Sequence, residues 1–193
     1  MSATTRYTGR RTIHWDRLKG TRAYTAIAVA TAGGAGLLPK APGTFGALVG
    51  VPIAYFTNGA PVEARVALWT FLLVIGTWSS KVFDEIMNSK DNQNIVIDEV
   101  VGLGITAWAA GTHPLTLLAS FIAFRFFDIV KPFPVRQVDT WSHKKASSKN
   151  PANTPGSQAP LWWGGFGVMA DDVLAGFQGL LVILLLQHYG IVP

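Results

Sequence analysis

Five carboxylates stand within or beside otherwise apolar stretches of this 193-residue chain. Asp98 and Glu99 lie in IVIDEVVGLG, Asp128 closes FRFFDIVKP, and Asp171 and Asp172 lie in GGFGVMADDVLAG. Ionisable side chains within apolar helices are costly, which makes them functional candidates. Carboxylates that lie close together repel one another unless a cation lies between them. A hard divalent cation such as Mg²⁺ suits them, because it prefers oxygen ligands and completes its shell with water and phosphate.

Other metal chemistries are disfavoured by the residue types present. The chain contains no cysteine, so thiolate metal sites, disulfides and a cysteine nucleophile are excluded. Its four histidines are scattered, which disfavours zinc. For any single acid, the alternative interpretation is an interfacial side chain that reaches water or pairs with a neighbour. For all five together, a shared site is favoured.

Several cationic and glycine-rich positions nearby indicate an anionic ligand. Arg125 lies three residues before Asp128, hence on the same helical face. Arg125 either neutralises Asp128 or binds phosphate with its planar guanidinium. Lys131 follows where the apolar stretch meets a proline, and GGAGLLPKAPGTFG places Lys40 and Thr44 in a glycine-rich segment. Such a segment at the start of a helix can present backbone N–H groups to an anion, although a simple glycine-rich membrane turn is the alternative.

The composition indicates which elements must hold these side chains. Hydrophobic residues make up 49% of the chain and charged residues only 14%, against about 25% charged in a typical soluble protein. We therefore predict an all-α, integral membrane helical bundle with short, glycine-rich spans. The expected elements are a segment at 23–37 and spans near 44–57, 64–80, 95–110, 115–130 and 168–187. Gly46 and Gly50 form a GxxxG pair that would let two helices approach closely.

The distribution of basic residues predicts the orientation of these spans. The net charge is +5, and the Lys and Arg residues concentrate in the first 22 residues and between 131 and 149. The turns at 58–63 and 111–114 and the end at 188–193 contain none. The positive-inside rule then places the amino terminus and the loops 81–94 and 131–165 in the cytoplasm. A nucleic-acid partner is disfavoured because no recognition module accompanies these charges.

This orientation brings the acids together. The span at 95 starts in the cytoplasm, the one ending at 130 returns there, and the one beginning at 168 leaves from there. All five carboxylates therefore lie at one depth, the cytoplasmic rim. We divide the chain into a basic cytoplasmic segment, 1–22, and one membrane-embedded domain, 23–193, with a flexible cytoplasmic loop at 141–163. No obligate protein partner is evident.

Four strings in this order, GLLPKAPGTFG, NIVIDEVVG, FRFFDIVKPFPVR and GGFGVMADDVLAG, resemble the phosphatidylglycerophosphatase A family over about residues 33–186. The resemblance implies a phosphatase domain in a bacterial inner membrane, with a lipid phosphomonoester as substrate. The implied reaction converts phosphatidylglycerophosphate into phosphatidylglycerol and inorganic phosphate with Mg²⁺. The acids that match the family's acidic positions are Asp98, Glu99, Asp128, Asp171 and Asp172. Arg125 and Lys131 match its FR..D..KP motif, and Pro42, Gly43 and Thr44 its PGT motif. The stretch 141–160 is longer than the family pattern and lies between motifs.

The site residues then receive expected roles. Asp98, Glu99, Asp171 and Asp172 would hold one or two Mg²⁺ ions. Arg125, Lys131, Lys40 and the loop around Thr44 would bind phosphate. The nucleophile is either a metal-activated water or an aspartate, and Asp128 or Glu99 would be the base for a water. Because neighbours on a helix point about 100° apart, we expect Asp172 to face the interior and Asp171 to reach sideways, toward a second metal position or the phosphate.

Three other interpretations compete with a phosphatase. A cation-coupled membrane transporter would use intramembrane carboxylates to bind its ion, but the sequence shows no paired repeats, and its acids cluster at one rim. A CDP-alcohol phosphotransferase would require a DG..AR motif, which is absent. A purely structural membrane subunit gives no reason for five carboxylates at one depth.

Overall fold

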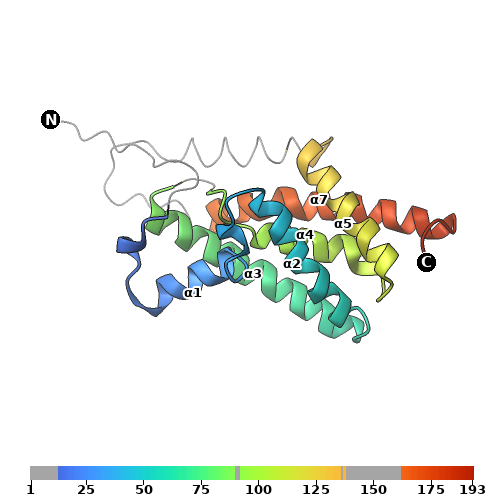
Figure 1. The fold of residues 1–193 in the computed structure, drawn as a ribbon, viewed down its shortest axis with the longest axis horizontal. Coiled ribbons are helices and arrows are strands. Elements are labelled where there is room, and N and C mark those ends of the chain that lie inside the picture. Colours follow the sequence, from blue (N-terminus) through green and yellow to red (C-terminus); the bar gives the residue numbers. More distant parts are fainter. Residues whose placement is uncertain (1–12, 90–91, 136, 138–161) are drawn as a thin grey trace.

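The computed structural model describes residues 13–89, 92–135, 137 and 162–193, and every regular element within them is helical. The predicted all-α class is confirmed. Short 3₁₀ turns occur at Trp15–Arg17 (η1), Ala35–Leu37 (η2) and Ala107–Ala109 (η3). The α-helices of Figure 1 are α1 (Gly20–Ala30), α2 (Pro42–Thr57), α3 (Val62–Met87), α4 (Ile97–Thr106), α5 (Pro114–Val130) and α7 (Trp162–His188).

Proline and left-handed residues mark where these helices begin and end. Pro42 and Pro114 occupy the first positions of α2 and α5, where a residue without an N–H and with a fixed φ fits well. Asn88 and Lys131 follow α3 and α5 with φ values of 50° and 45°, the left-handed conformation that commonly ends a helix. The bounds of α2 and α5 agree with the expected segments to within two residues.

Two helices are longer than the sequence predicts. The third helix does not end at residue 80, because Val82, Phe83 and Met87 continue its buried face. On its outer face Lys81 pairs with Glu85 at 3.2 Å, so residues 81–87, which were expected in a loop, belong to the helix. The loop expected at 81–94 is thus only the connection 88–96. The last helix starts at Trp162 rather than 168, so the end of the expected loop 141–163 is helical, while 141–161 lies outside the described residues.

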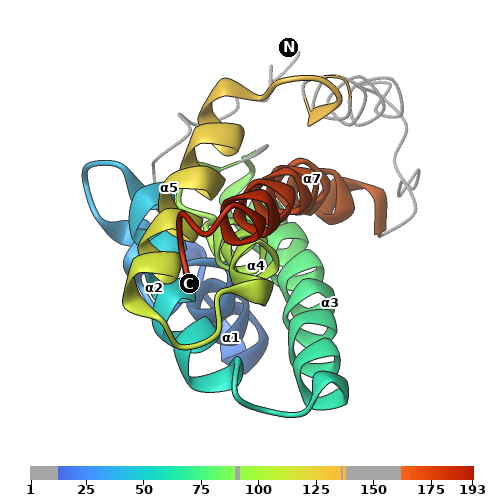
Figure 2. The same cartoon turned by 90° about the vertical axis from the view of Figure 1, so that its right-hand side faces the viewer.

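The short helix α4 forms the centre of the bundle. Its ten residues measure about 15 Å, half of a bilayer core of about 30 Å, so the expected span at 95–110 is a buried interior helix. Val100, Val101 and Leu103 are buried. Figure 2, which looks along the bundle, shows α4 enclosed by α2, α3, α5 and α7, and each of these helices contacts it.

Close contacts at glycines establish the directions of the helices. A Cβ on Gly46 of α2 would lie 2.6 Å from the Cβ of Val96, and one on Gly50 would lie 2.9 Å from the side chain of Leu103. Helices α2 and α4 therefore run in parallel. The hydroxyl of Thr106 in α4 donates to the carbonyl of Gly176 in α7 at 3.0 Å. The contacts between these two helices advance together along both chains, so α7 also runs parallel to α4.

The remaining long helices run the opposite way. Phe124, near the end of α5, lies beside Gly102, while Thr116 at its start donates to the carbonyl of Pro193 at 3.0 Å. Gly76 of α3 faces Ile97, and Trp69, earlier in α3, lies beside Gly104. The starts of α2 and α4, the ends of α3 and α5, and the 171–172 stretch of α7 thus meet at one end of the bundle. We call this the acidic end.

The outer faces of the bundle are apolar. Phe56 is 80% exposed, Ile122 60% and Leu181 63%, and such faces favour contact with hydrocarbon or another protein over contact with water. Two helices within the described residues are long and apolar enough to cross a membrane. They are Val62–Met87, with mean hydropathy 1.5, and Met169–His188, with mean hydropathy 1.8. These features suggest a membrane protein, while the number and orientation of its spans stay predictions.

Candidate active site

Three of the five predicted acids meet at the acidic end. Asp98, Glu99 and Asp172 each offer one carboxylate oxygen, and these oxygens lie within 4.8 Å of one another. Asp172 is only 5% exposed. Oε2 of Glu99 is buried and has no hydrogen-bond partner among the described residues. A buried, unpaired carboxylate oxygen is costly, and the arrangement is compatible with a cation bound between the three carboxylates.

The first turn of α4 supplies two of these acids. Asp98 and Glu99 are the second and third residues of the helix, and the Glu99 N–H donates to Oδ1 of Asp98 at 3.1 Å. Carboxylates are favoured in the first turn of a helix, because the exposed N–H groups there carry partial positive charge. The local fold thus tolerates two adjacent acids at this point, and α7 brings Asp172 to them.

Asp171 has a different partner from its neighbour. Its carboxylate forms an ion pair with Nζ of Lys131 at 2.6 Å, whereas Asp172 belongs to the three-carboxylate group. This divergence is the one expected of adjacent residues on a helix. The four acids proposed as metal ligands are therefore divided in this structure, and Lys131, proposed as a phosphate ligand, is engaged with an acid.

Arg125 and Asp128 form a second ion pair at the same end. Nη1 of Arg125 lies 2.5 Å from Oδ2 of Asp128, and both side chains are largely buried. Asp128 also interacts electrostatically with Glu99 and Asp172. Nε of Arg125 is buried without a hydrogen-bond partner among the described residues. Of the two predicted roles of Arg125, neutralisation of Asp128 is the one observed. Its Nε–H donor remains without a partner among the described residues.

The first turn of α2 completes the cluster. A Cβ on Gly43 would overlap Oε1 of Glu99 and would lie 3.2 Å from Nη1 of Arg125, so only glycine lets the backbone approach both groups. Thr44 is half-buried in the same turn. Lys40 is exposed on the turn before α2, and no contact of the described residues joins it to the carboxylates. Sequence reasoning matched Gly43 to a motif but missed its contact with Glu99, which only the packing of α2 on α4 reveals.

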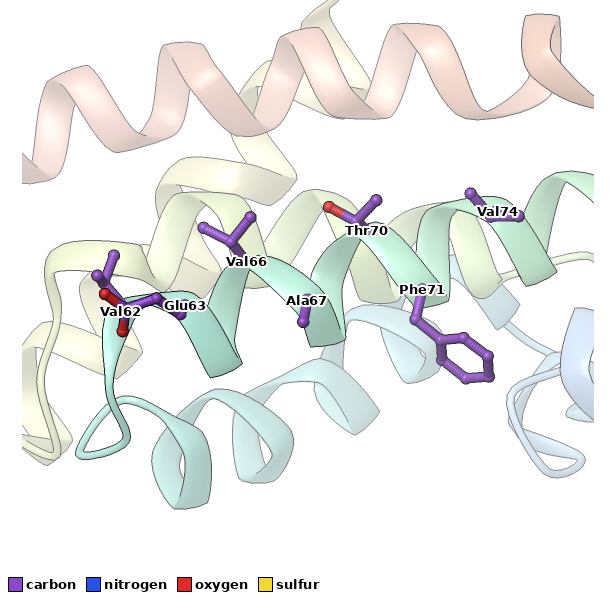
Figure 3. A pocket seen from close by; sticks show the side chains of 7 residues that line it. All are labelled: Val62, Glu63, Val66, Ala67, Thr70, Phe71 and Val74. Atoms are coloured by element: carbon purple, nitrogen blue, oxygen red, sulfur yellow. The ribbon is translucent and has the colours of Figure 1, made fainter.

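A separate apolar groove runs along the first half of α3. It has a volume of about 720 Å³, and Figure 3 shows its lining side chains, Val62, Glu63, Val66, Ala67, Thr70, Phe71 and Val74. This half of α3 reaches α4 at Gly104, through Trp69, and so lies away from the acidic end. The groove suits contact with hydrocarbon, and its single acid offers no metal site.

The donor chemistry of the acidic end is compatible with a divalent cation. The three-carboxylate group offers only oxygen atoms, the ligands that hard cations such as Mg²⁺ prefer. The unpaired Oε2 of Glu99 and the short separations between like charges fit a bound cation better than an empty pocket of acids. Arg125 and Lys131 add positive charge at the edge of the group. The arrangement therefore combines a candidate metal site with cationic side chains that could bind an anion.

Comparison with known proteins relates these residues to a family. The family model described as Phosphatidylglycerophosphatase A matches residues 28–147. Phosphatidylglycerophosphatase A of Escherichia coli is 29% identical over 175 residues, 90% of this chain and 89% of that protein. Phosphatidylglycerophosphatase A of Haemophilus influenzae is 32% identical over 158 residues, 81% of this chain and 85% of that protein.

A third relative has a different name. A protein of Bacteroides thetaiotaomicron is 31% identical over 169 residues, 83% of this chain and 92% of that protein, and bears the provisional name phosphatidylinositol-3-phosphatase. No solved structure matches the chain. None of these relatives favours the transporter reading. The acidic cluster and the two relatives named alike lead to one conclusion: this chain belongs to the phosphatidylglycerophosphatase A family and is a phosphatase.

Proposed function

We propose that this chain is a Mg²⁺-dependent lipid phosphatase that hydrolyses phosphatidylglycerophosphate to phosphatidylglycerol and inorganic phosphate. The observation that carries the proposal is the group formed by Asp98, Glu99 and Asp172, with Arg125 beside it, in a chain of this family. The two relatives named phosphatidylglycerophosphatase A suggest the headgroup.

Asp98, Glu99 and Asp172 would hold the cation. When bound, Mg²⁺ supplies Lewis-acid neutralisation of charge on phosphate oxygens. Asp171 lies outside this group and would instead hold Lys131, whose Nζ is 2.6 Å from Oδ2 of Asp171. In this arrangement Lys131 remains at the edge of the cluster and can turn toward an incoming phosphate.

Arg125 and the first turn of α2 would bind the phosphate. Nη1 of Arg125 pairs with Asp128, and its Nε is buried without a hydrogen-bond partner among the described residues. A guanidinium has five N–H donors and can therefore bind two anions at once. The backbone of Gly43 lies against the same guanidinium, and the first amides of a helix are free to bind an anion. Thr44 and Lys40 would add contacts from the same segment.

The chemical step needs mainly positioning and charge neutralisation. Hydrolysis forms a P–O bond to the attacking oxygen and breaks the ester P–O bond, and the departing glycerol oxygen takes up a proton. The attacking group is either water or an aspartate of the cluster. An aspartate would form an acyl phosphate, which water then hydrolyses to release inorganic phosphate and restore the carboxylate. If water attacks, Asp128 or Glu99 receives its proton. Asp128 would be held for this task by Arg125.

The apolar exterior supports a location in the bilayer. We propose a multi-pass protein of the bacterial inner membrane with its acidic end facing the cytoplasm, because the basic residues concentrate on the connections at that end. The acyl chains of the substrate would lie against the apolar helices, and its phosphate would reach the carboxylates at the rim. No obligate protein partner is required by this arrangement.

The proposal is tested by phosphate release from purified, detergent-solubilised protein. Phosphatidylglycerophosphate should be hydrolysed with Mg²⁺ and not with excess EDTA, and faster than phosphatidic acid or phosphatidylinositol 3-phosphate. The Asp172→Asn variant is the matched control, because it keeps the side-chain shape and removes the charge. Metal-independent hydrolysis by the wild-type protein would contradict the proposed chemistry, and a preference for another lipid would contradict the proposed headgroup.

A further inference from the structure

A hydrogen-bond network outside the acidic cluster fixes the connection between α3 and α4. Oδ1 of Asp84, in the last turn of α3, accepts from Oγ of Ser89 at 2.7 Å and from the N–H of Asn92 at 3.3 Å. Nδ2 of Asn92 donates to the same Ser89 hydroxyl at 3.3 Å. These three side chains tie the connection to the end of α3.

The network continues to the residue that precedes α4. Oδ1 of Asn92 accepts from the N–H of Asn94 at 3.1 Å, and its backbone carbonyl accepts from the N–H of Ile95 at 2.9 Å. The N–H of Val96 donates to the carbonyl of Ala30 in α1 at 2.8 Å. Asn92 is only 1% exposed, and a buried amide is stable only when it is hydrogen-bonded. The path from α3 to α4 is therefore held by defined polar contacts.

Asp84 occupies a position that a helix alone disfavours. A negative charge in the last turn opposes the helix dipole. The adjacent Glu85 is an exposed side chain in a surface pair with Lys81, whereas Asp84 is half-buried and directed to the connection. The carboxylate of Asp84 thus serves the connection rather than α3.

Tight packing after the network leaves little freedom at the start of α4. Val96 lies against Gly46 of α2, and Ile97 lies against Gly76 of α3, where an added Cβ would come within 3.1 Å. Both residues are buried. Because packed interiors transmit displacements rather than absorb them, a shift at Asn92 would move the first turn of α4, which carries Asp98 and Glu99.

We propose that Asp84 and Asn92 are positioning residues for the metal-binding carboxylates. They set where α4 begins, and they thereby set the separation of Asp98 and Glu99 from Asp172 on α7. The inference rests on the proposed function for the identity of what these carboxylates bind. The network itself contributes no metal ligand.

The test measures Mn²⁺ binding by electron paramagnetic resonance on the purified full-length protein in detergent, without substrate. Asp84→Ala and Asn92→Ala should each raise the Kd for Mn²⁺ by about tenfold, the lower range found when outer partners of metal ligands are removed. Asp84→Asn should stay within about threefold of wild type, because its Oδ1 still accepts both hydrogen bonds. Glu85→Gln, on the same turn, is the matched control and should bind as wild type does.

The Asp98→Asn variant distinguishes failure of the proposed metal site from failure of the proposed positioning role. If Asp98→Asn leaves Mn²⁺ binding unchanged, the proposed metal site is wrong. If it abolishes binding while Asp84→Ala and Asn92→Ala bind as wild type does, only the positioning role is overturned. Should either alanine variant fail to fold by circular dichroism, Ser89→Ala decides. It removes the hydroxyl shared by Asp84 and Asn92 and should raise the Kd about threefold, and an unchanged Kd would overturn the inference.

Discussion

The carboxylate of Glu99 lies directly against the backbone of Gly43, so that a Cβ on residue 43 would overlap Oε1. The contact joins the first turn of α2 to the first turn of α4, two segments more than fifty residues apart in the chain. The same backbone lies beside the guanidinium of Arg125. Gly43 therefore lies where a proposed metal ligand and a proposed phosphate ligand meet.

Gly43→Ala tests this contact. The added methyl group must displace Glu99, so phosphate release should fall by about tenfold or more, as expected when catalytic groups are misplaced. Stability should change little, because alanine is a better helix former than glycine. Enzyme assay and thermal unfolding measure the two effects. Gly59→Ala is the control, since no atom lies within 4 Å of its added Cβ, and equal activity of both variants would show that the contact has no catalytic importance.

The convergence of acids was predictable because chain direction alone places them. Asp98 lies near the start of one apolar segment, Asp128 near the end of the next, and Asp172 near the start of the last. Because successive helices alternate in direction, these three positions come to the same end of the bundle. The choice of partners was not predictable. Whether Asp171 joins the carboxylate group or pairs with Lys131 depends on the rotation of α7 against α5, which no local pattern encodes.

The lengths of α4 and α3 could not be predicted from the sequence either. Apart from Asp98, Glu99 and Thr106, the stretch 95–110 is apolar and therefore resembles a membrane span. Only the surrounding helices show that ten residues of it form a buried helix. We expected a loop from residue 81, although Lys81 pairs with Glu85 on the outer face of α3 while Phe83 and Met87 continue its buried face. Such assignments depend on tertiary contacts rather than on periodicity.

Arg125→Lys tests the phosphate role of Arg125. Lysine keeps the positive charge but loses the planar set of donors, so turnover should fall by about tenfold or more. The Kd for Mn²⁺ should stay near the wild-type value, because Arg125 pairs with Asp128, which is not one of the three clustered carboxylates. A variant that folds poorly yet retains full turnover per folded molecule would indicate that Arg125 serves only to neutralise Asp128.

The predicted orientation can be tested because the chain contains no cysteine. Single cysteines at Ser147, in the basic stretch, and at Gly59, between α2 and α3, should react with an impermeant thiol reagent from opposite sides of the membrane. Residue 59 is exposed, and Ser147 lies outside the described residues. In intact cells only the cysteine at 59 should be labelled, and in inverted vesicles only the one at 147. Labelling of both in intact cells would overturn the topology.

Asp171 and Asp172 provide the sharpest comparison, because the two neighbours have the same chemistry and different partners. Asp172→Asn removes one of three clustered carboxylates, so hydrolysis should become undetectable, and the Kd for Mn²⁺ should rise by more than about 100-fold, beyond the loss typical of an outer partner. Asp171→Asn breaks the ion pair with Lys131 and leaves all three clustered carboxylates in place, so this variant should still bind Mn²⁺ and should regain part of its activity in excess Mg²⁺.

A double-variant cycle shows whether Asp172 and Asp98 act on one ion. If they do, adding Asp98→Asn to Asp172→Asn should weaken Mn²⁺ binding much less than the sum of the two single effects, because residues that share a partner are not additive. Combined with Asp171→Asn, the same change should be closer to additive, since Asp171 lies outside the three-carboxylate group and pairs with Lys131. Near-wild-type activity and Mn²⁺ affinity in Asp172→Asn would remove the metal site as proposed, and with it the chemical basis for placing phosphate hydrolysis at the acidic end.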